Sequence, residues 1–185
     1  MNITIADLRL DQVVKFQETT SMLYESFRTP VNAAVWDIND AFREVQDSMS
    51  PDCISRIAMD EYGRLLGWVA GASAYNGNVW ELHPLVVHPS YRGQGVGRAL
   101  VLDFEQRVKE RGGVTIYLGT DDEDNRTSLG GVELYPDVWQ HMAQVKNLNR
   151  HPFEFYQKMG FSIVGVIPDA NGLGKPDILM AKRVA

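Results

Sequence analysis

The sequence lacks the residues and patterns that mark several large classes of protein. It has one cysteine, Cys53, among 185 residues, and a single thiol can neither form an internal disulfide nor complete a metal cluster. The four histidines form no i,i+4 pair and have no cysteine beside them, so the spacing offers no metal-ligand set. We therefore expect a protein without internal disulfides and without a bound metal.

Long apolar runs and an excess of positive charge are also missing. No run approaches the roughly 20 apolar residues of a membrane helix, and the N-terminus lacks the basic-then-apolar pattern of a signal peptide. The formal net charge of −6 disfavours nucleic acid and anionic membrane as partners, since both select basic surfaces. These observations predict a cytoplasmic protein for which a cationic small molecule is the easier ligand.

What the chain does have is ordinary globular character. Hydrophobic residues make up 44% and charged residues 23% of the sequence, which are values typical of folded domains. No internal repeat, low-complexity tract or Pro/Ser-rich linker divides it, and its length fits one domain. We predict a single domain over residues 1–185.

Hydrophobic periodicity predicts an α/β fold. Strand, glycine loop, helix and strand follow one another in the middle of the chain, whereas the preceding hairpins require antiparallel pairing. The expected result is a mixed sheet with helices packed on it. Strands are predicted at residues 2–5, 54–59, 65–74, 79–87, 114–118, 161–167 and 178–182, and helices at residues 11–27, 32–49, 98–111, 134–148 and 152–159.

The most specific stretch is Arg92-Gly93-Gln94-Gly95-Val96-Gly97, which follows a predicted strand and opens a predicted helix. Glycines let a backbone turn tightly and bring its N–H groups against an anion, while the helix start adds its dipole. The dinucleotide and nucleotide-triphosphate patterns do not fit, because Arg98 replaces the third glycine and no Gly-Lys-Ser/Thr follows. A turn that serves only compactness is the alternative, but three glycines at alternate positions favour a phosphate loop.

The strand before this loop carries candidate proton-transfer groups. A period of two places Glu81, His83 and Leu85 on one face. Pro84 cannot donate a ladder hydrogen bond, so it requires a sheet edge, a bulge or a splayed gap. Glu81 and His83 are candidate bases, and their alternatives are a solvated carboxylate and a satisfied, partly buried imidazole. The neighbouring loop favours the functional interpretation for Glu81 only.

These residues resemble the GNAT superfamily of acyl-CoA N-acetyltransferases, whose Arg/Gln-x-x-Gly-x-Gly/Ala pattern is matched by Arg92, Gly95 and Gly97. From about residue 65 onward the chain is similar to the chromosomal Gram-positive aminoglycoside 6′-N-acetyltransferases. The resemblance implies a GNAT fold with a mixed, mostly antiparallel sheet splayed at the cofactor slot, helices on both faces, and a homodimer. The matching segments are Trp80 to Val87 and residues 111–113, 116–122, 151–152, 154–156, 175–177 and 180–182.

The resemblance also implies a reaction, in which a substrate amine attacks acetyl-CoA directly within a ternary complex. Glu81 would be the base, acting through water, and His83 an accessory polar residue. The backbone N–H of Leu85 would polarise the thioester carbonyl, and Tyr156 would be the acid for the departing thiolate, although its position also suits a core residue. The predicted acetyl-CoA site comprises Leu85, Val86, Val87, Arg92, Gly93, Gln94, Gly95, Val96, Gly97, Arg98 and Tyr156.

The acceptor site is predicted at Trp36, Glu81, Asp121 and Asp122. The last two belong to an acidic run whose ordinary meaning is a solvated loop, but in this fold the preceding strand ends at the cofactor slot. Residues 27–37, an acceptor wall in the superfamily, depart from the family. The resemblance implies an aminoglycoside such as kanamycin or tobramycin as the leading acceptor, with a polyamine, peptide or protein amine as the alternative. An acyl-CoA-binding sensor is the non-enzymatic alternative.

Overall fold

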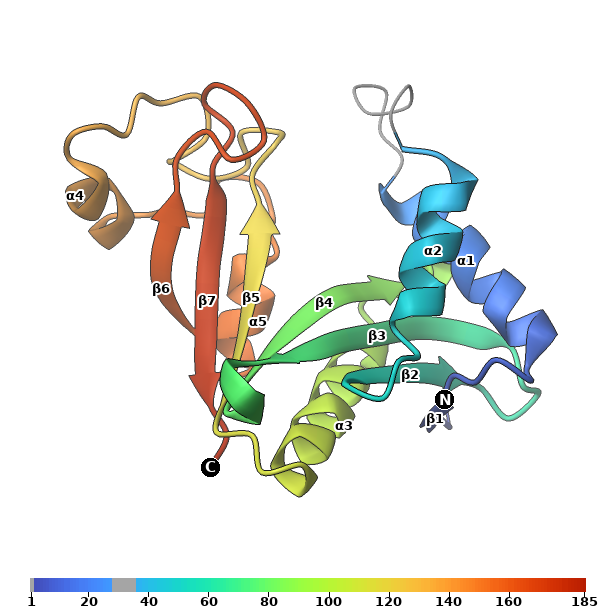
Figure 1. Cartoon of the computed structure of the whole chain (residues 1–185). Helices are drawn as coiled ribbons and strands as arrows, with labels where there is room; N and C mark the ends of the chain where they lie inside the picture. The colour runs from blue at the N-terminus through green and yellow to red at the C-terminus, as the bar shows by residue number, and fades with distance from the viewer. Residues whose placement is uncertain (1, 28–35) are drawn as a thin grey trace. The chain divides into compact units, whose positions relative to one another are not determined.

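The computed structural model describes residues 2–27 and 36–185. Its contacts divide the chain into two compact units, residues 1–114 and 115–185, which are described in turn (Figure 1). The single domain expected from the sequence remains a prediction. The first unit contains β1 (Thr4–Asp7), α1 (Val13–Phe27), α2 (Ile38–Asp47), β2 (Cys53–Met59), β3 (Leu65–Ala74), β4 (Val79–Val87) and α3 (Val96–Glu110), with short 3-10 turns at Tyr75–Gly77 and Pro89–Tyr91.

The strands of the first unit form an antiparallel sheet in the order β1-β2-β3-β4, with helices on both faces. Successive side chains of β3 point to opposite faces of the sheet. Trp68 and Ala70 belong to the apolar cluster that α1 and α2 form on one face. Gly67 and Gly71 lie under α3. A Cβ on Gly71 would lie 2.5 Å from the Phe104 ring, and a Cβ on Gly67 would lie 3.1 Å from Leu100. These glycines let α3 pack closely on the sheet.

Helix α3 follows its predicted pattern. The apolar residues that define its spacing, Leu100, Val101, Phe104 and Val108, are all completely buried. The helix ends at Glu110, and Gly112 takes a left-handed φ of +78°, which is the usual helix stop. The predicted helix and its glycine terminator are therefore confirmed.

Strand β4 contains a β-bulge at His83 and Pro84. Val69 pairs with Leu85 and Gly71 pairs with Leu82, so His83 and Pro84 together oppose the single residue between them on β3. Of the three outcomes expected for Pro84, the structure has the bulge. An extra residue in a strand reverses the in-out alternation beyond it.

The bulge corrects one expectation about β4. Glu81 pairs with Ala72, on the face of β3 that α1 and α2 cover, whereas Leu85 pairs with Val69, on the face that α3 covers. Directly paired residues of an antiparallel sheet share a face. The prediction that Leu85 lies on the same face as Glu81 is therefore wrong, because strict alternation does not hold across a bulge.

The second unit contains β5 (Thr115–Asp121), α4 (Val138–Ala143), α5 (Phe153–Lys158), β6 (Ser162–Ile167) and β7 (Asp177–Arg183). Its strands are antiparallel in the order β5-β7-β6, and its core includes the fully buried Ile116, Leu118, Ile178 and Met180. The α/β fold class with mostly antiparallel strands is thus as predicted.

The helix predicted over residues 134–148 is the least accurate element. It covers only Val138–Ala143, because Pro136 has no N–H and cannot lie inside a helix. After α4 the chain turns back, and Asn147 forms an isolated bridge with Thr127. Across the described ranges, no helix combines the length and apolarity required to cross a membrane.

Candidate active site

The glycine loop joins β4 to α3 in the first unit. Gly93 and Gly95 have φ angles of +74° and +89°, a region that side chains other than glycine rarely adopt. A Cβ on either residue would meet no atom within 4 Å. Glycine is therefore required here by backbone conformation, and the outer side of the loop is open to a ligand.

Side chains of the loop hydrogen-bond to its own backbone. Arg92 donates through Nε to the carbonyl of Val87 at 3.2 Å, and Gln94 donates through Nε2 to the carbonyl of Ser90 at 2.9 Å. Gly95 gives α3 no side-chain cap, and the first N–H groups of a helix have no intrahelical acceptor. Because these donors lie at the positive end of the helix dipole, the loop suits the pyrophosphate of a coenzyme.

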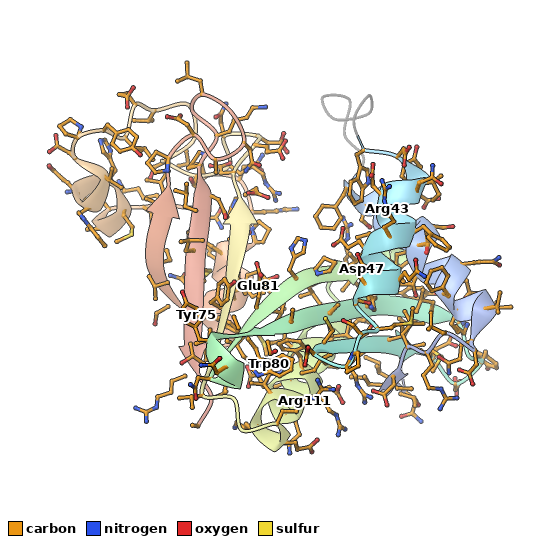
Figure 2. All side chains as sticks on the ribbon, in the orientation of Figure 1. Arg43, Asp47, Tyr75, Trp80, Glu81 and Arg111 are labelled. Atoms are coloured by element: carbon orange, nitrogen blue, oxygen red, sulfur yellow. The ribbon has the colours of Figure 1, made fainter. Side chains whose placement is uncertain are left out.

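Glu81 and His83 both lie on the α1/α2 side of the first-unit sheet. Glu81 is partly buried, and His83 reaches α2, with its Nε2 3.2 Å from Oε1 of Glu44. Figure 2 labels Glu81 on β4, with Arg43 and Asp47 on α2. The sequence predicts only a helix over residues 32–49 and does not distinguish Glu44 from the other carboxylates on it. Asp40, Glu44 and Asp47 share one face of α2, but this spacing does not indicate the contact with His83.

Trp36 precedes α2 and packs against the apolar cluster of the first unit. Asp37 caps the helix by accepting hydrogen bonds from the N–H groups of Asn39 and Asp40 at 2.7 and 3.0 Å, so the position of Trp36 is fixed by the helix start. The contact of Trp36 with the acceptor remains a prediction. Of the segment 27–37, residues 28–35 lie outside the described part of the chain.

Tyr156, on α5 of the second unit, is 9% exposed. Its ring meets Phe155 and Phe161 edge-on, at centroid distances of 5.1 and 5.7 Å. Burial raises the pKa of its phenol above the ordinary value, so the hydroxyl stays protonated at neutral pH. The environment suits a core residue and also a hydrogen-bond donor, and the predicted acid role remains a prediction.

Asp121 and Asp122 differ sharply although they are neighbours. Asp121 is exposed and accepts a hydrogen bond from Asn171 Nδ2 at 2.5 Å. Asp122 is completely buried, and its carboxylate accepts from the N–H of Arg126 and from the N–H and hydroxyl of Thr127, at 2.6 to 2.9 Å. The prediction that Asp122 contacts the acceptor is therefore corrected, because its oxygens organise its own loop.

His151 is a second polar group buried in this unit. It is 2% exposed, its Nε2 lies 3.0 Å from the Asp121 carbonyl, and its Nδ1 accepts from the N–H of Phe153 at 3.3 Å. Burial, the largest cause, lowers its pKa, so the imidazole is neutral and donates from Nε2. His151 fixes the end of β5.

Comparison with known proteins identifies the family. The profile of the GNAT family of acetyltransferases matches residues 17–135, more than half of the chain. The chain belongs to the GNAT acetyltransferase family. Its predicted family and fold are thereby confirmed, and the glycine loop lies within the matched residues.

Individual GNAT proteins resemble the chain over different lengths. An aminoglycoside 6′-N-acetyltransferase solved with coenzyme A is 38% identical, with a TM-score of 0.90, covering 98% of this chain and 97% of that one. The aminoglycoside 6′-N-acetyltransferase from Enterococcus faecium is also 38% identical, with a TM-score of 0.88 and the same coverage. An acetyltransferase of Pectobacterium atrosepticum is 30% identical over 95 residues, and this chain spans 65% of that relative's length.

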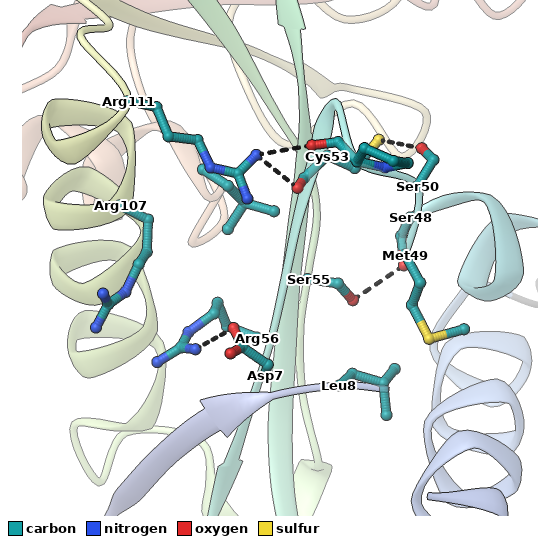
Figure 3. Close-up of a pocket in the computed structure, with 12 residues that line it drawn as sticks. Asp7, Leu8, Ser48, Met49, Ser50, Cys53, Ser55, Arg56, Arg107 and Arg111 are labelled. Atoms are coloured by element: carbon teal, nitrogen blue, oxygen red, sulfur yellow. Dashed lines mark hydrogen bonds and ion pairs between the residues drawn. The ribbon is translucent and has the colours of Figure 1, made fainter. Parts of the chain in front are cut away.

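A cavity of about 220 Å³ lies elsewhere in the first unit of this GNAT chain (Figure 3). Three arginines line it: Arg56 bonds to Asp7 and Asp103, Arg107 pairs with Glu110 at 2.7 Å, and Arg111 donates to the carbonyl of Cys53 at 2.9 Å. Arg111 also stacks on Trp80. None of the residues predicted to bind the coenzyme or the acceptor lines this cavity. Among the described residues, no group of three or more His, Cys, Asp or Glu is arranged to hold a metal.

Proposed function

We propose that this GNAT acetyltransferase transfers the acetyl group of acetyl-CoA to the 6′-amino group of aminoglycosides. One observation carries the proposal: the 38% identity to two solved aminoglycoside 6′-N-acetyltransferases extends over 98% of the chain. The similarity thus includes the N-terminal third, where the sequence had revealed no family pattern. Direct attack in a ternary complex, a homodimer and a cytoplasmic location belong to the same proposal and rest on the family resemblance.

The glycine loop and the start of α3 would hold the coenzyme. Acetyl-CoA would supply the acetyl thioester, and the chain would bind its pyrophosphate through backbone N–H groups from Gly93 to Arg98. The positive φ angles of Gly93 and Gly95 and the open space around them support this assignment. Val86 and Val87 end the strand that leads into the loop.

Glu81 would accept the proton that makes the acceptor amine nucleophilic. An ammonium group has no lone pair, so it must lose a proton before it attacks, and a carboxylate can receive it directly or through water. Partial burial of Glu81 on the sheet face that α2 also covers supports this role. His83, two residues along the strand, would assist.

Negative charge developing during transfer would meet two donors. The backbone N–H of Leu85 would donate to the carbonyl oxygen, an interaction typically worth about 3 kcal/mol at the transition state. Tyr156 would donate to the departing sulfur. Full proton transfer from a phenol to a thiolate of pKa about 8.5 is uphill, so with its raised pKa Tyr156 would act chiefly as a hydrogen-bond donor.

The acceptor would be a polycation. The net charge of −6 favours one, and Glu81, Trp36 and the exposed Asp121 are the residues proposed to meet it. The alternatives, a polyamine, a peptide amine or a protein amine, require the same chemistry but a different acceptor surface.

An amine panel tests this proposal. Purified protein is given acetyl-CoA with kanamycin, tobramycin, spermidine or a peptide amine, and thiol release is followed. We expect kcat/KM to be highest for the aminoglycosides, with NMR of the product placing the acetyl group on the 6′ nitrogen. A preference for spermidine or the peptide would overturn the acceptor assignment. Tight coenzyme A binding without turnover of any amine would instead indicate an acyl-CoA sensor.

A further inference from the structure

Glu44 lies beside the proposed proton-transfer residues of the first unit. Its Oε1 is 3.2 Å from Nε2 of His83, and the two side chains are 27% and 60% exposed. The same Oε1 atom is buried and makes no hydrogen bond within the described residues. The approach of the imidazole is close enough for an ion pair but is misaligned for a hydrogen bond. The imidazole nitrogen thus lies within ion-pair distance of a buried carboxylate oxygen that has no hydrogen bond among the described residues.

The charged groups around His83 are predominantly negative. Glu44 faces it from α2, and Glu81 lies on the same face of β4. Asp40 and Asp47 lie one turn before and after Glu44, and Asp40 is neutralised by Arg43 at 2.5 Å. Strand β3 contributes no titratable side chain. On α1, Lys15 and Glu18 pair with each other at 2.7 Å.

We propose that Glu44 is a positioning residue for acetyl transfer, which holds the imidazole of His83 with its proton on Nε2 and its lone pair on Nδ1. A carboxylate that accepts from one imidazole nitrogen fixes the tautomer and makes the other nitrogen the base. The inference rests on the proposed function, since it assigns His83 a share of the same proton transfer.

The proton balance gives Glu44 a second effect. The acceptor ammonium gives its proton to Glu81, and the O–H bond so formed then breaks as an N–H bond forms at Nδ1 of His83, directly or through a water. His83 then carries a positive charge, which the carboxylate of Glu44 balances at close range. Without Glu44 the imidazole would be less basic and less firmly oriented, while Glu81 would remain in place.

An NMR titration tests the pairing without depending on turnover. The imidazole signals of His83 are followed against pH in the wild type and in Glu44→Gln, with Asp47→Asn as the matched control that removes one negative charge from the same helix. We expect the midpoint of His83 to move to lower pH in Glu44→Gln and to change much less in Asp47→Asn. An unchanged midpoint in Glu44→Gln, or an equal shift in Asp47→Asn, would overturn the pairing.

Kinetics with the best amine of the panel then tests the role. Glu44→Gln should lower kcat about tenfold, leave the KM for acetyl-CoA unchanged, and move the acid limb of the pH–rate profile to lower pH. In a His83→Asn background the Glu44→Gln change should have no further effect, whereas additive losses would overturn action through His83. A shifted NMR midpoint with unchanged kcat would overturn the positioning role, and a failure of the aminoglycosides alone would overturn only the proposed acceptor.

Discussion

In the first unit the glycine loop and the helix it opens leave backbone donors exposed, whereas in the second unit the polar groups near the end of β5 bond to their own surroundings. Gly95 provides α3 with no side-chain cap. Asp122, by contrast, is completely buried and accepts three hydrogen bonds from its own loop. Both ring nitrogens of His151 are also hydrogen-bonded. A polar residue near a site is therefore available to a ligand only when the fold has not already satisfied it.

The largest expected effect is on turnover, from substitution of Glu81 in the first unit. Glu81→Gln keeps the shape of the side chain but removes the proposed base, so kcat should fall about 10²-fold at neutral pH. Part of the loss should be recovered at high pH, where more of the acceptor amine is already deprotonated. The pH–rate profiles of both proteins are the measurement, with the melting temperature as a control for folding. A mutant profile equal to that of the wild type would remove Glu81 from the mechanism.

Substitution of the buried Asp122 in the second unit should lower the free energy of unfolding. Asp122→Ala strands three buried donors, and we expect a loss of about 3 kcal/mol. For a chain of this size the melting temperature should then drop by about 10 °C. The matched control is Asp121→Ala, at an exposed position, which should change the melting temperature by less than about 2 °C. Equal drops for both variants would contradict the contrast between these neighbours.

A matched pair of substitutions distinguishes the proposed coenzyme-binding role of the glycine loop from the conformational role that glycine has in any turn. Gly95→Val and Gly77→Val both place a branched side chain at a left-handed φ, of +89° and +85°, with no atom within 4 Å of the added Cβ. Both should lose about 1–2 kcal/mol of stability. Only Gly95→Val should also weaken acetyl-CoA binding in calorimetry, by about tenfold or more, because its Cβ occupies the side of the loop that the phosphates approach. Unchanged affinity in folded Gly95→Val protein would remove the loop from the coenzyme site.

The smallest effect concerns the exposed member of the acidic pair. Asp121→Asn should raise the acceptor KM by about threefold at low salt and flatten its dependence on ionic strength, because surface charges are screened over about 8–10 Å at physiological salt. The KM for acetyl-CoA should change little, since close backbone donors hold its phosphates. Steady-state kinetics across a salt series is the measurement. An acceptor KM that does not respond to salt in the wild type would exclude electrostatic steering of the acceptor.

Much of the fold could be predicted because periodicity reports burial. Strand β4 and strand β3 lie at the predicted residues, and the buried stripe of α3 matches its apolar spacing. The predictions fail where the orientation or burial of a residue depends on contacts with another segment of the chain. The side that Leu85 faces depends on the register with β3, and the burial of Asp122 depends on a loop that folds back over it. Neither leaves a periodic trace in the sequence.

The same difference applies to the site. The tight turn at Gly93 and Gly95 could be predicted because glycine is chosen for a local backbone conformation, which the neighbouring residues already indicate. Glu44 could not be identified in this way. Its relation to His83 joins a helix to a strand 39 residues later in the chain, and one surface carboxylate on a helix looks like any other until the fold brings the two together.

The bulge in β4 also constrains how this segment can change during evolution. Because His83 and Pro84 oppose one residue of β3, the length of the segment determines which side of the sheet Glu81 and Leu85 each face. Substitution of either bulge residue keeps that arrangement, but deletion of one would turn one half of the strand over and change the face of Glu81 relative to the loop that follows. We therefore expect relatives of this chain to keep the number of residues between Leu82 and Leu85 fixed.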